Sequence, residues 1–345
     1  MEQFNPYDMG AAPQYRLWQK NELRSLRRMS RAGGCALLYI CAMQLVLALG
    51  LDWLAERAGG FIGMYVPGAE VKLYWDGFTY LLIGLFAVMP GVLIGLRMLS
   101  PAEHNLSLPF RRESGSRGRE SGGRFTTAKV VFAGAFLCFA GNLASSLLAS
   151  FAGRFGYGFM GPEETPSETT AGFLFMMLAV AIVPAVGEEA LIRGMVMQPL
   201  RRYGDGFALV CSALLFAVLH QNLAQAPMAF VSGLAIGWAA LRTGTLWAPI
   251  LIHMWNNGAS VILRALEKPL GEERAGAAMT AYMVMLVVLG ALALASLWRG
   301  RDRQPRPANP IGAGARAVHY FFGSPAMVVA LAYMAAMLVL TTMKL

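Results

Sequence analysis

The chain has 345 residues, of which 56% are hydrophobic and 14% are charged, and its formal net charge is +9. A mean hydropathy of +0.49 is too high for an ordinary water-soluble protein. In a soluble chain this positive charge would indicate nucleic-acid binding. Here the Lys and Arg residues lie mostly between apolar segments, so we expect a lipid bilayer, and no nucleic acid, around the protein.

About nine segments approach the roughly 20 apolar residues that a membrane-spanning helix needs. The loops on one side of these segments are rich in Lys and Arg, as cytoplasmic loops are. The sequence therefore predicts an all-α polytopic (multi-pass) protein of the cell membrane, with about nine transmembrane helices and a cytoplasmic N-terminus. The predicted spans are residues 33–52, 77–97, 129–152, 172–198, 207–223, 226–241, 245–264, 277–298 and 325–343.

Changes in composition divide the chain into six parts. The predicted parts are a cytoplasmic basic tail (1–32), a two-helix N-terminal membrane segment (33–100), a flexible basic cytoplasmic loop (101–128), a core with ionisable residues inside its spans (129–298), a cytoplasmic linker (299–324) and a C-terminal transmembrane helix (325–345).

The basic tail has a pattern of its own. From about Gln14 to Arg31, apolar residues alternate with Lys and Arg. This predicts either a basic amphipathic helix on an anionic membrane surface or a solvated basic tail. Neither alternative implies chemistry.

In the span at 172–198, two acidic residues are adjacent. Arg193 follows Glu189 by four residues, which is a favourable order for an ion pair within a helix. Glu188 points about 100° away from Glu189 around the helix axis, so its own helix gives it no partner. Pro184 removes one backbone hydrogen bond just before this pair and predicts a kink.

Two later spans each carry one histidine. His220 follows Phe216 by four residues, and His253 precedes Asn257 by four, so each pair shares a helix face. A membrane His or a Glu–Arg pair is by itself as often structural as functional. Together, these ionisable residues on nearby spans predict a functional site, because buried ionisable groups are costly unless they are used.

The residue types allow two kinds of chemistry. A carboxylate and an imidazole can hold and deprotonate a water molecule, while a second imidazole and a carboxamide can stabilise an oxyanion. That combination would hydrolyse an amide. Alternatively, Glu188, His220 and His253 would bind Zn²⁺, since two His and one carboxylate form a catalytic zinc set. The zincin motif HExxH is absent from the sequence.

The three motifs together resemble one family. Glu188-Glu189-x-x-x-Arg193, Phe216-x-x-x-His220 and His253-x-x-x-Asn257 are similar to the motifs of the CAAX protease and bacteriocin-processing (CPBP, or Abi) family, over about residues 172–264. The resemblance implies that Glu188 is the general base, helped by His220. It also implies an oxyanion hole of His253 and Asn257, and a site organised by Glu189 and Arg193.

The resemblance leaves the cofactor open. Members are often described as metalloproteases, whereas a metal-free, glutamate-dependent mechanism is argued for the eukaryotic branch. We expect that no cofactor is required, with zinc as the alternative, because Glu188 with His220 suffices chemically.

These observations predict an intramembrane endopeptidase that cleaves a membrane-associated peptide or protein. The alternative is a non-proteolytic bacteriocin-immunity or membrane scaffold protein of the same family. A secondary transporter that uses Glu188 as a proton site is disfavoured, because no inverted repeat is visible.

Overall fold

The structure is a computed structural model that describes residues 13–62, 70–104, 124–159, 167, 169–299 and 315–344. Most of the predicted basic loop and much of the predicted linker therefore lie outside the described residues. The described part is almost entirely helical, with one antiparallel pair of short strands.

In chain order the elements are α1 (Pro13–Ile62), α2 (Val71–Leu82), a π-helical segment (Ile83–Val88), α3 (Met89–Met98), α4 (Pro101–His104), α5 (Arg124–Gly153), β1 (Tyr157–Phe159), α6 (Thr170–Met176), a π-helical segment (Met177–Ile182), α7 (Val183–Glu189), a π-helical segment (Ala190–Met197), α8 (Gln198–Leu200), a 3-10 turn (Arg201–Tyr203), α9 (Asp205–Leu219), α10 (Ala226–Thr243), α11 (Trp247–Leu270), α12 (Glu272–Arg299), α13 (Ala315–Phe322), α14 (Pro325–Leu340) and β2 (Thr342–Lys344).

The helical membrane-protein class is confirmed, but the number of spans is not. By length and composition, five helices of the described chain suffice to cross a membrane, or six if the bent pair α13 and α14, which meet at 83°, counts as one span. The helices α9, α10 and α11 fail this test. The reason is physical: α9 has only 15 residues, and α11 carries His and Asn residues that lower its hydropathy. Nine spans and a cytoplasmic N-terminus stay predictions.

The N-terminal basic region is part of a helix of 50 residues, α1, which continues without a break through the predicted first span. Its apolar residues Leu23, Leu26 and Met29 are buried against the protein, while its basic residues form an exposed stripe. Tyr203 donates a hydrogen bond to the carbonyl of Glu22 at 3.1 Å. The apolar face that could have lain on a membrane is thus occupied by the protein itself.

The last long helix of the described chain, α14, packs against the first, α1. α14 lies against α1, where Ser30 donates to Ser324 at 2.7 Å and Gly34 allows the backbone of Met327 to approach closely. A Cβ at Gly34 would clash with that backbone, so only glycine fits here. Beyond α14, β2 pairs with β1, so Tyr157 faces Lys344 in the register.

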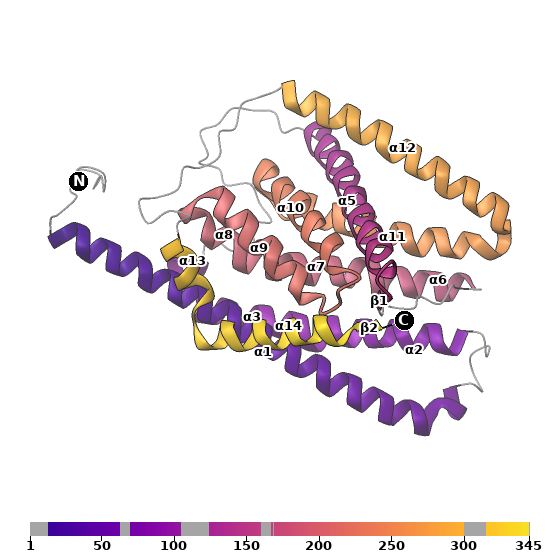
Figure 1. Cartoon of the computed structure of the whole chain (residues 1–345), viewed down its shortest axis with the longest axis horizontal. Helices are drawn as coiled ribbons and strands as arrows, with labels where there is room; N and C mark the ends of the chain where they lie inside the picture. Colours follow the sequence, from indigo (N-terminus) through magenta and orange to yellow (C-terminus); the bar gives the residue numbers. More distant parts are fainter. Residues whose placement is uncertain are drawn as a thin grey trace.

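The acidic segment lies in the middle of the molecule. Figure 1 shows α1, α3 and α14 along one side and α5 and α12 along the other, with α7, α9 and α10 between them. One core cluster joins α1, α3, α9, α14 and the segment Ala190–Met197, and a second joins α5, α10, α11 and α12. Side chains from α7 and α11 therefore meet between two packed layers.

Candidate active site

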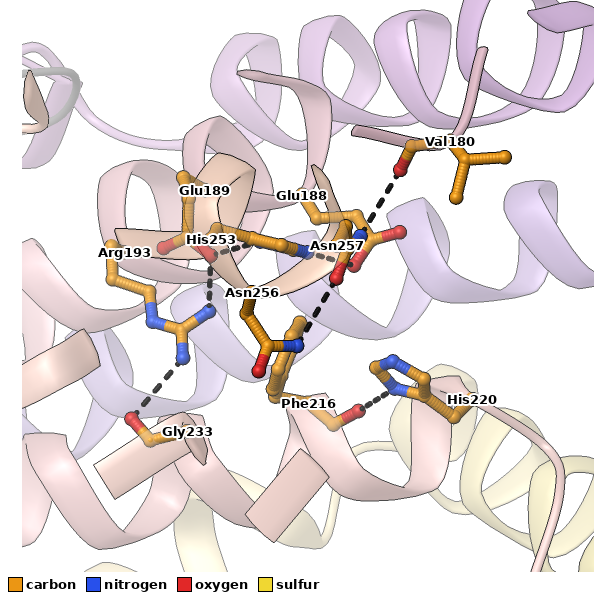
Figure 2. Close-up of polar contacts among 10 residues, drawn as sticks. All are labelled: Val180, Glu188, Glu189, Arg193, Phe216, His220, Gly233, His253, Asn256 and Asn257. Atoms are coloured by element: carbon orange, nitrogen blue, oxygen red, sulfur yellow. Dashed lines mark hydrogen bonds and ion pairs between the residues drawn. The ribbon is translucent and has the colours of Figure 1, made fainter. Parts of the chain in front are cut away.

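Pro184 shapes the helix that carries the two acidic residues. It lies in the first turn of α7, directly after the π-helical segment Met177–Ile182. A proline has no N–H, so Pro184 cannot donate to the carbonyl of Val180, four residues earlier. That carbonyl accepts a hydrogen bond from Nδ2 of Asn257 at 3.1 Å (Figure 2). The missing N–H of Pro184 thus leaves a backbone acceptor for a side chain of α11.

Glu189 and Arg193 form the predicted ion pair in the interior of the protein. Their Oε1 and Nη1 atoms are 2.9 Å apart, and both side chains are 0% exposed. The guanidinium also donates to the carbonyl of Gly233 at 3.1 Å and lies 4.3 Å from the ring centre of Phe216. A buried ion pair needs such further partners, because the loss of water costs both ions several kcal/mol.

His253 lies between the two acidic residues. Its Nδ1 is 2.8 Å from Oε1 of Glu189, and its Nε2 is 4.0 Å from Oε2 of Glu188. In Figure 2 the imidazole is seen with Glu189 on one side and Glu188 on the other. Glu188 and Glu189 are adjacent, so their side chains point in different directions from the helix. Each carboxylate can therefore face a different nitrogen of the same ring.

The partners of His253 decide where its proton sits. Glu189 is paired with Arg193, so its carboxylate is ionised and only accepts hydrogen bonds. Nδ1 of His253 must therefore carry a proton and donate a hydrogen bond to Glu189. In the neutral ring, Nε2 then holds a lone pair that points towards Glu188.

His220 is linked to the site through Phe216. Its Nδ1 is 2.8 Å from the carbonyl oxygen of Phe216, which is an acceptor only, so Nδ1 donates this hydrogen bond. The Phe216 ring stands edge-to-face to His220 at 4.8 Å and to His253 at 5.7 Å between ring centres. Among the described residues, no hydrogen bond or ion pair joins His220 to Glu188 (Figure 2).

The structure thus gathers four of the six predicted site residues, Glu188, Glu189, Arg193 and His253, in one connected set of contacts. Asn257 lies on the same helix as His253 and bonds to the carbonyl of Val180, and His220 lies beside the set across the Phe216 ring.

Sequence reasoning missed several partners of these residues. The carbonyls of Val180 and Gly233 hold Asn257 and Arg193, yet backbone acceptors have no sequence signature. Pro184 was the available signal for Val180, because it marks the carbonyl four residues earlier. Asn256 was also missed: its Nδ2 donates to Oδ1 of Asn257 at 3.3 Å. Two adjacent Asn residues inside an apolar span were the available sign.

The residues suggested for zinc do not fit the ion as they are placed. In the described ranges, no group of three or more His, Cys, Asp or Glu side chains is arranged to hold a metal. Zinc ligands lie about 2.0–2.2 Å from the ion. Two ligands at these distances on a tetrahedral ion are about 3.3–3.6 Å from each other. The candidate atoms of Glu188 and His253 are 4.0 Å apart, and in the described chain no hydrogen bond or ion pair joins His220 to either residue.

Comparison with known proteins identifies the segment that carries the site. Residues 170–259 match the family model described as Type II CAAX prenyl endopeptidase Rce1-like. This match contains all six predicted site residues, and at the level of the family it supports a CAAX-protease-like membrane enzyme with a peptide or protein substrate. No significant match was found among curated proteins or solved structures. The match over residues 170–259 confirms the resemblance to the CAAX protease family that the motifs predicted.

Proposed function

We propose that this protein is an intramembrane endopeptidase that hydrolyses a peptide bond of a membrane-associated peptide or protein with water activated by Glu188. One observation carries the proposal. The side chain of Glu188 is 22% exposed, and its Oε2 atom is buried without a hydrogen-bond partner among the described residues. An unsatisfied carboxylate oxygen in a membrane protein is costly, and its default interpretation is functional.

The gap between Glu188 and His253 suits a water molecule. A separation of 4.0 Å between Oε2 and Nε2 is too long for a direct hydrogen bond. We propose that one water bridges the two atoms by donating a hydrogen bond to each of them. Glu189 holds the imidazole in the tautomer that accepts from this water, as the carboxylate of a catalytic triad orients its histidine.

The proposed reaction then needs no reactant other than water and the peptide. The water oxygen attacks the carbonyl carbon while Glu188 takes its proton, giving a tetrahedral intermediate with a negatively charged oxygen. When the C–N bond breaks, the proton passes from Glu188 to the leaving nitrogen. The products are a carboxyl group and an amine.

Asn257 is the proposed oxyanion donor. Its carboxamide has two N–H groups, and one of them is given to Val180. The other is free to donate to the oxyanion. His253 contacts Glu189 through Nδ1 and faces Glu188 through Nε2, so we assign it a water-holding role in place of the oxyanion role expected from the family. His220 keeps its predicted role of assisting Glu188, because catalytic hydrogen bonds often form only with substrate bound.

We further propose that catalysis requires no tightly bound metal. The support is that Glu188 and His253 can activate water by themselves, while the placed residues do not fit zinc. Treatment of the purified protein with a chelator is expected to leave the cleavage rate unchanged. Loss of activity that zinc restores would contradict this proposal and leave the endopeptidase proposal intact.

The endopeptidase proposal is tested by Glu188→Gln, which keeps the size of the side chain and removes its basicity. The substrate probe is a fluorescence-quenched peptide with a prenylated cysteine near its carboxyl end, the class named by the matched family. We expect cleavage in proteoliposomes to fall by about 10²–10⁴-fold, the usual contribution of a general base.

The matched control is Glu272→Gln at the exposed start of α12, which should cleave at the unsubstituted rate. If Glu188→Gln also cleaves at that rate, the proposal is wrong. The non-proteolytic immunity or scaffold alternative would then be the better interpretation of the same motifs.

A further inference from the structure

The turn that follows His220 has an unusual backbone. α9 ends at Leu219, and Gln221 has a φ of 51°, the one positive φ of a non-glycine residue in the described chain. A side chain disfavours this left-handed conformation, because its Cβ approaches the following carbonyl. Such a conformation persists where the surrounding structure holds it, and it occurs often at functional sites.

A residue of α1 holds Gln221. Its Nε2 donates a hydrogen bond of 2.6 Å to Oε1 of Gln44 and lies 4.0 Å from the sulfur of Cys41. Gln44 is half-buried in the apolar part of α1. A glutamine in such a helix typically bonds across to a neighbouring segment, since no water is available there.

Further contacts tie the same turn to other helices. The backbone N–H of Leu223 donates to Thr341, which follows α14, at 3.3 Å. The N–H of Met228 donates to Ser145 of α5 at 2.9 Å. The turn between α9 and α10 is thus held by α1 and by the end of α14, and the first turn of α10 is held by α5. All three lie outside the segment that matches the family.

The left-handed residue affects His220 directly. His220 is the last residue of α9 to keep a helical backbone, and the change of conformation at Gln221 ends the helix there. The N–H of Gln221 still closes the last turn, on the carbonyl of Val218 at 3.0 Å. The His220 ring, with Nδ1 on the Phe216 carbonyl, therefore stands where the chain leaves the helix, directly before the left-handed residue.

We propose that Gln44 is a positioning residue for His220: by holding Gln221 in the left-handed conformation, it fixes the imidazole beside the catalytic water. This inference rests on the proposed function, in which His220 assists Glu188. It extends the working site beyond the family segment to the N-terminal helix, which sequence analysis predicted only as a membrane segment.

The test compares Gln44→Met with Gln44→Glu. Methionine has similar length but cannot accept the hydrogen bond, whereas glutamate still offers an oxygen to Gln221. With the prenylated probe peptide, we expect Gln44→Met to lower kcat by about 10- to 100-fold with KM within about twofold, the effect of a misplaced catalytic group. Gln44→Glu should keep most of the activity, and Gln14→Leu, an exposed change on the same helix, should keep all of it.

A second variant tests the role of the backbone. Glycine adopts the left-handed conformation without penalty, so it needs no holding. In a protein that already carries Gln221→Gly, Gln44→Met should therefore lower kcat much less than it does in the unsubstituted protein. Amide hydrogen exchange should become faster at residues 221–224 in Gln44→Met and stay unchanged in β1 and α5. This readout requires no substrate.

The outcomes separate the inference from the proposed function. If Gln44→Met keeps its kcat while Glu188→Gln is inactive, the positioning role is wrong and the endopeptidase stands. An equal loss from Gln44→Met with and without the Gln221→Gly change would also overturn the role. If Glu188→Gln itself keeps full activity, the proposed function fails first.

Discussion

At the level of single residues, one carboxylate oxygen of Glu189 accepts hydrogen bonds from two different side chains. Its Oε1 accepts from Arg193 at 2.9 Å and from His253 at 2.8 Å, while its Oε2 has no partner among the described residues. The same oxygen therefore holds the packing between helices and sets the tautomer of a site residue. This explains why a pair that looks purely structural in the sequence also belongs to the candidate site.

The buried pair should be worth more than an exposed pair of the same spacing. Arg193→Met leaves the charge of Glu189 buried without its partner, and we expect the free energy of unfolding to fall by about 3–5 kcal/mol. The matched control is Lys72→Met, which breaks the exposed i,i+4 pair of Lys72 and Asp76 at 3.5 Å. That change should cost less than about 1 kcal/mol.

Both variants are measured by denaturant unfolding in mixed micelles. Similar small losses for Arg193→Met and Lys72→Met would show that the buried pair is not a structural requirement. If Arg193→Met instead loses much activity and little stability, the role of Arg193 is to orient Glu189 and not to stabilise the fold.

Residue spacing predicted the parts of the site that lie within one helix. The i,i+4 rule correctly placed Arg193 on Glu189. It could not show that His253 bonds to Glu189, because that contact joins two helices whose mutual rotation depends on packing. It also assigned Glu188 and Glu189 separate roles, whereas the structure places His253 between them.

At the level of elements, Pro184 links the shape of a helix to the position of Asn257. Pro184→Ala would supply an N–H that can donate to the carbonyl of Val180, in competition with Asn257. A proline inside a helix is normally destabilising, so the alanine variant should be at least as stable as the unsubstituted protein. We expect its kcat to fall about tenfold, since the oxyanion donor loses its support.

The control is Pro227→Ala in the first turn of α10, where a missing N–H costs nothing. Both variants are followed by thermal unfolding and by cleavage of the probe peptide. Full activity in Pro184→Ala would contradict the proposed link, whereas a fall in both stability and activity would mean that the proline is needed for packing.

Helices were easier to predict than their roles. Apolar length correctly indicated a helical membrane protein, because the bilayer core imposes it. The same criterion counted α9 and α10 as ordinary spans, although most residues of α9 and half of those of α10 are buried inside the protein. Nothing in the residue pattern indicated that α1 is continuous across the predicted boundary at residue 32, since a basic face suits both a tail and a docked helix.

For the whole molecule, the two ends of the chain are tied to the centre. α1 and α14 pack together, and the β1–β2 pair joins the chain after α14 to the chain after α5. Nine alternating spans that start from a cytoplasmic N-terminus would put residues 157–159 and 342–344 on the outer side, because an odd number of spans precedes each of them. Their pairing agrees with that prediction, because strands on opposite membrane faces could not form a ladder.

The topology itself can be tested at two positions. Between Asn21 and Arg154 the described chain has three helices that are long and apolar enough to cross a membrane. The helices α9 to α11 come after Arg154, so whether they cross does not affect this comparison. An odd number of crossings puts the two residues on opposite sides. The exposed basic stripe of α1 around Asn21 favours the cytoplasmic side for the N-terminus.

We therefore expect Arg154→Cys to react with a membrane-impermeant maleimide on intact cells, and Asn21→Cys to react only after permeabilisation. The unsubstituted chain is the control, and its four cysteines should stay unlabelled because they are buried or half-buried. Labelling of Asn21→Cys alone on intact cells would invert the predicted orientation. Labelling of both would mean that one of the three helices does not cross the membrane. Because β1 follows Arg154 closely and pairs with β2, both strands would then lie on the outer face.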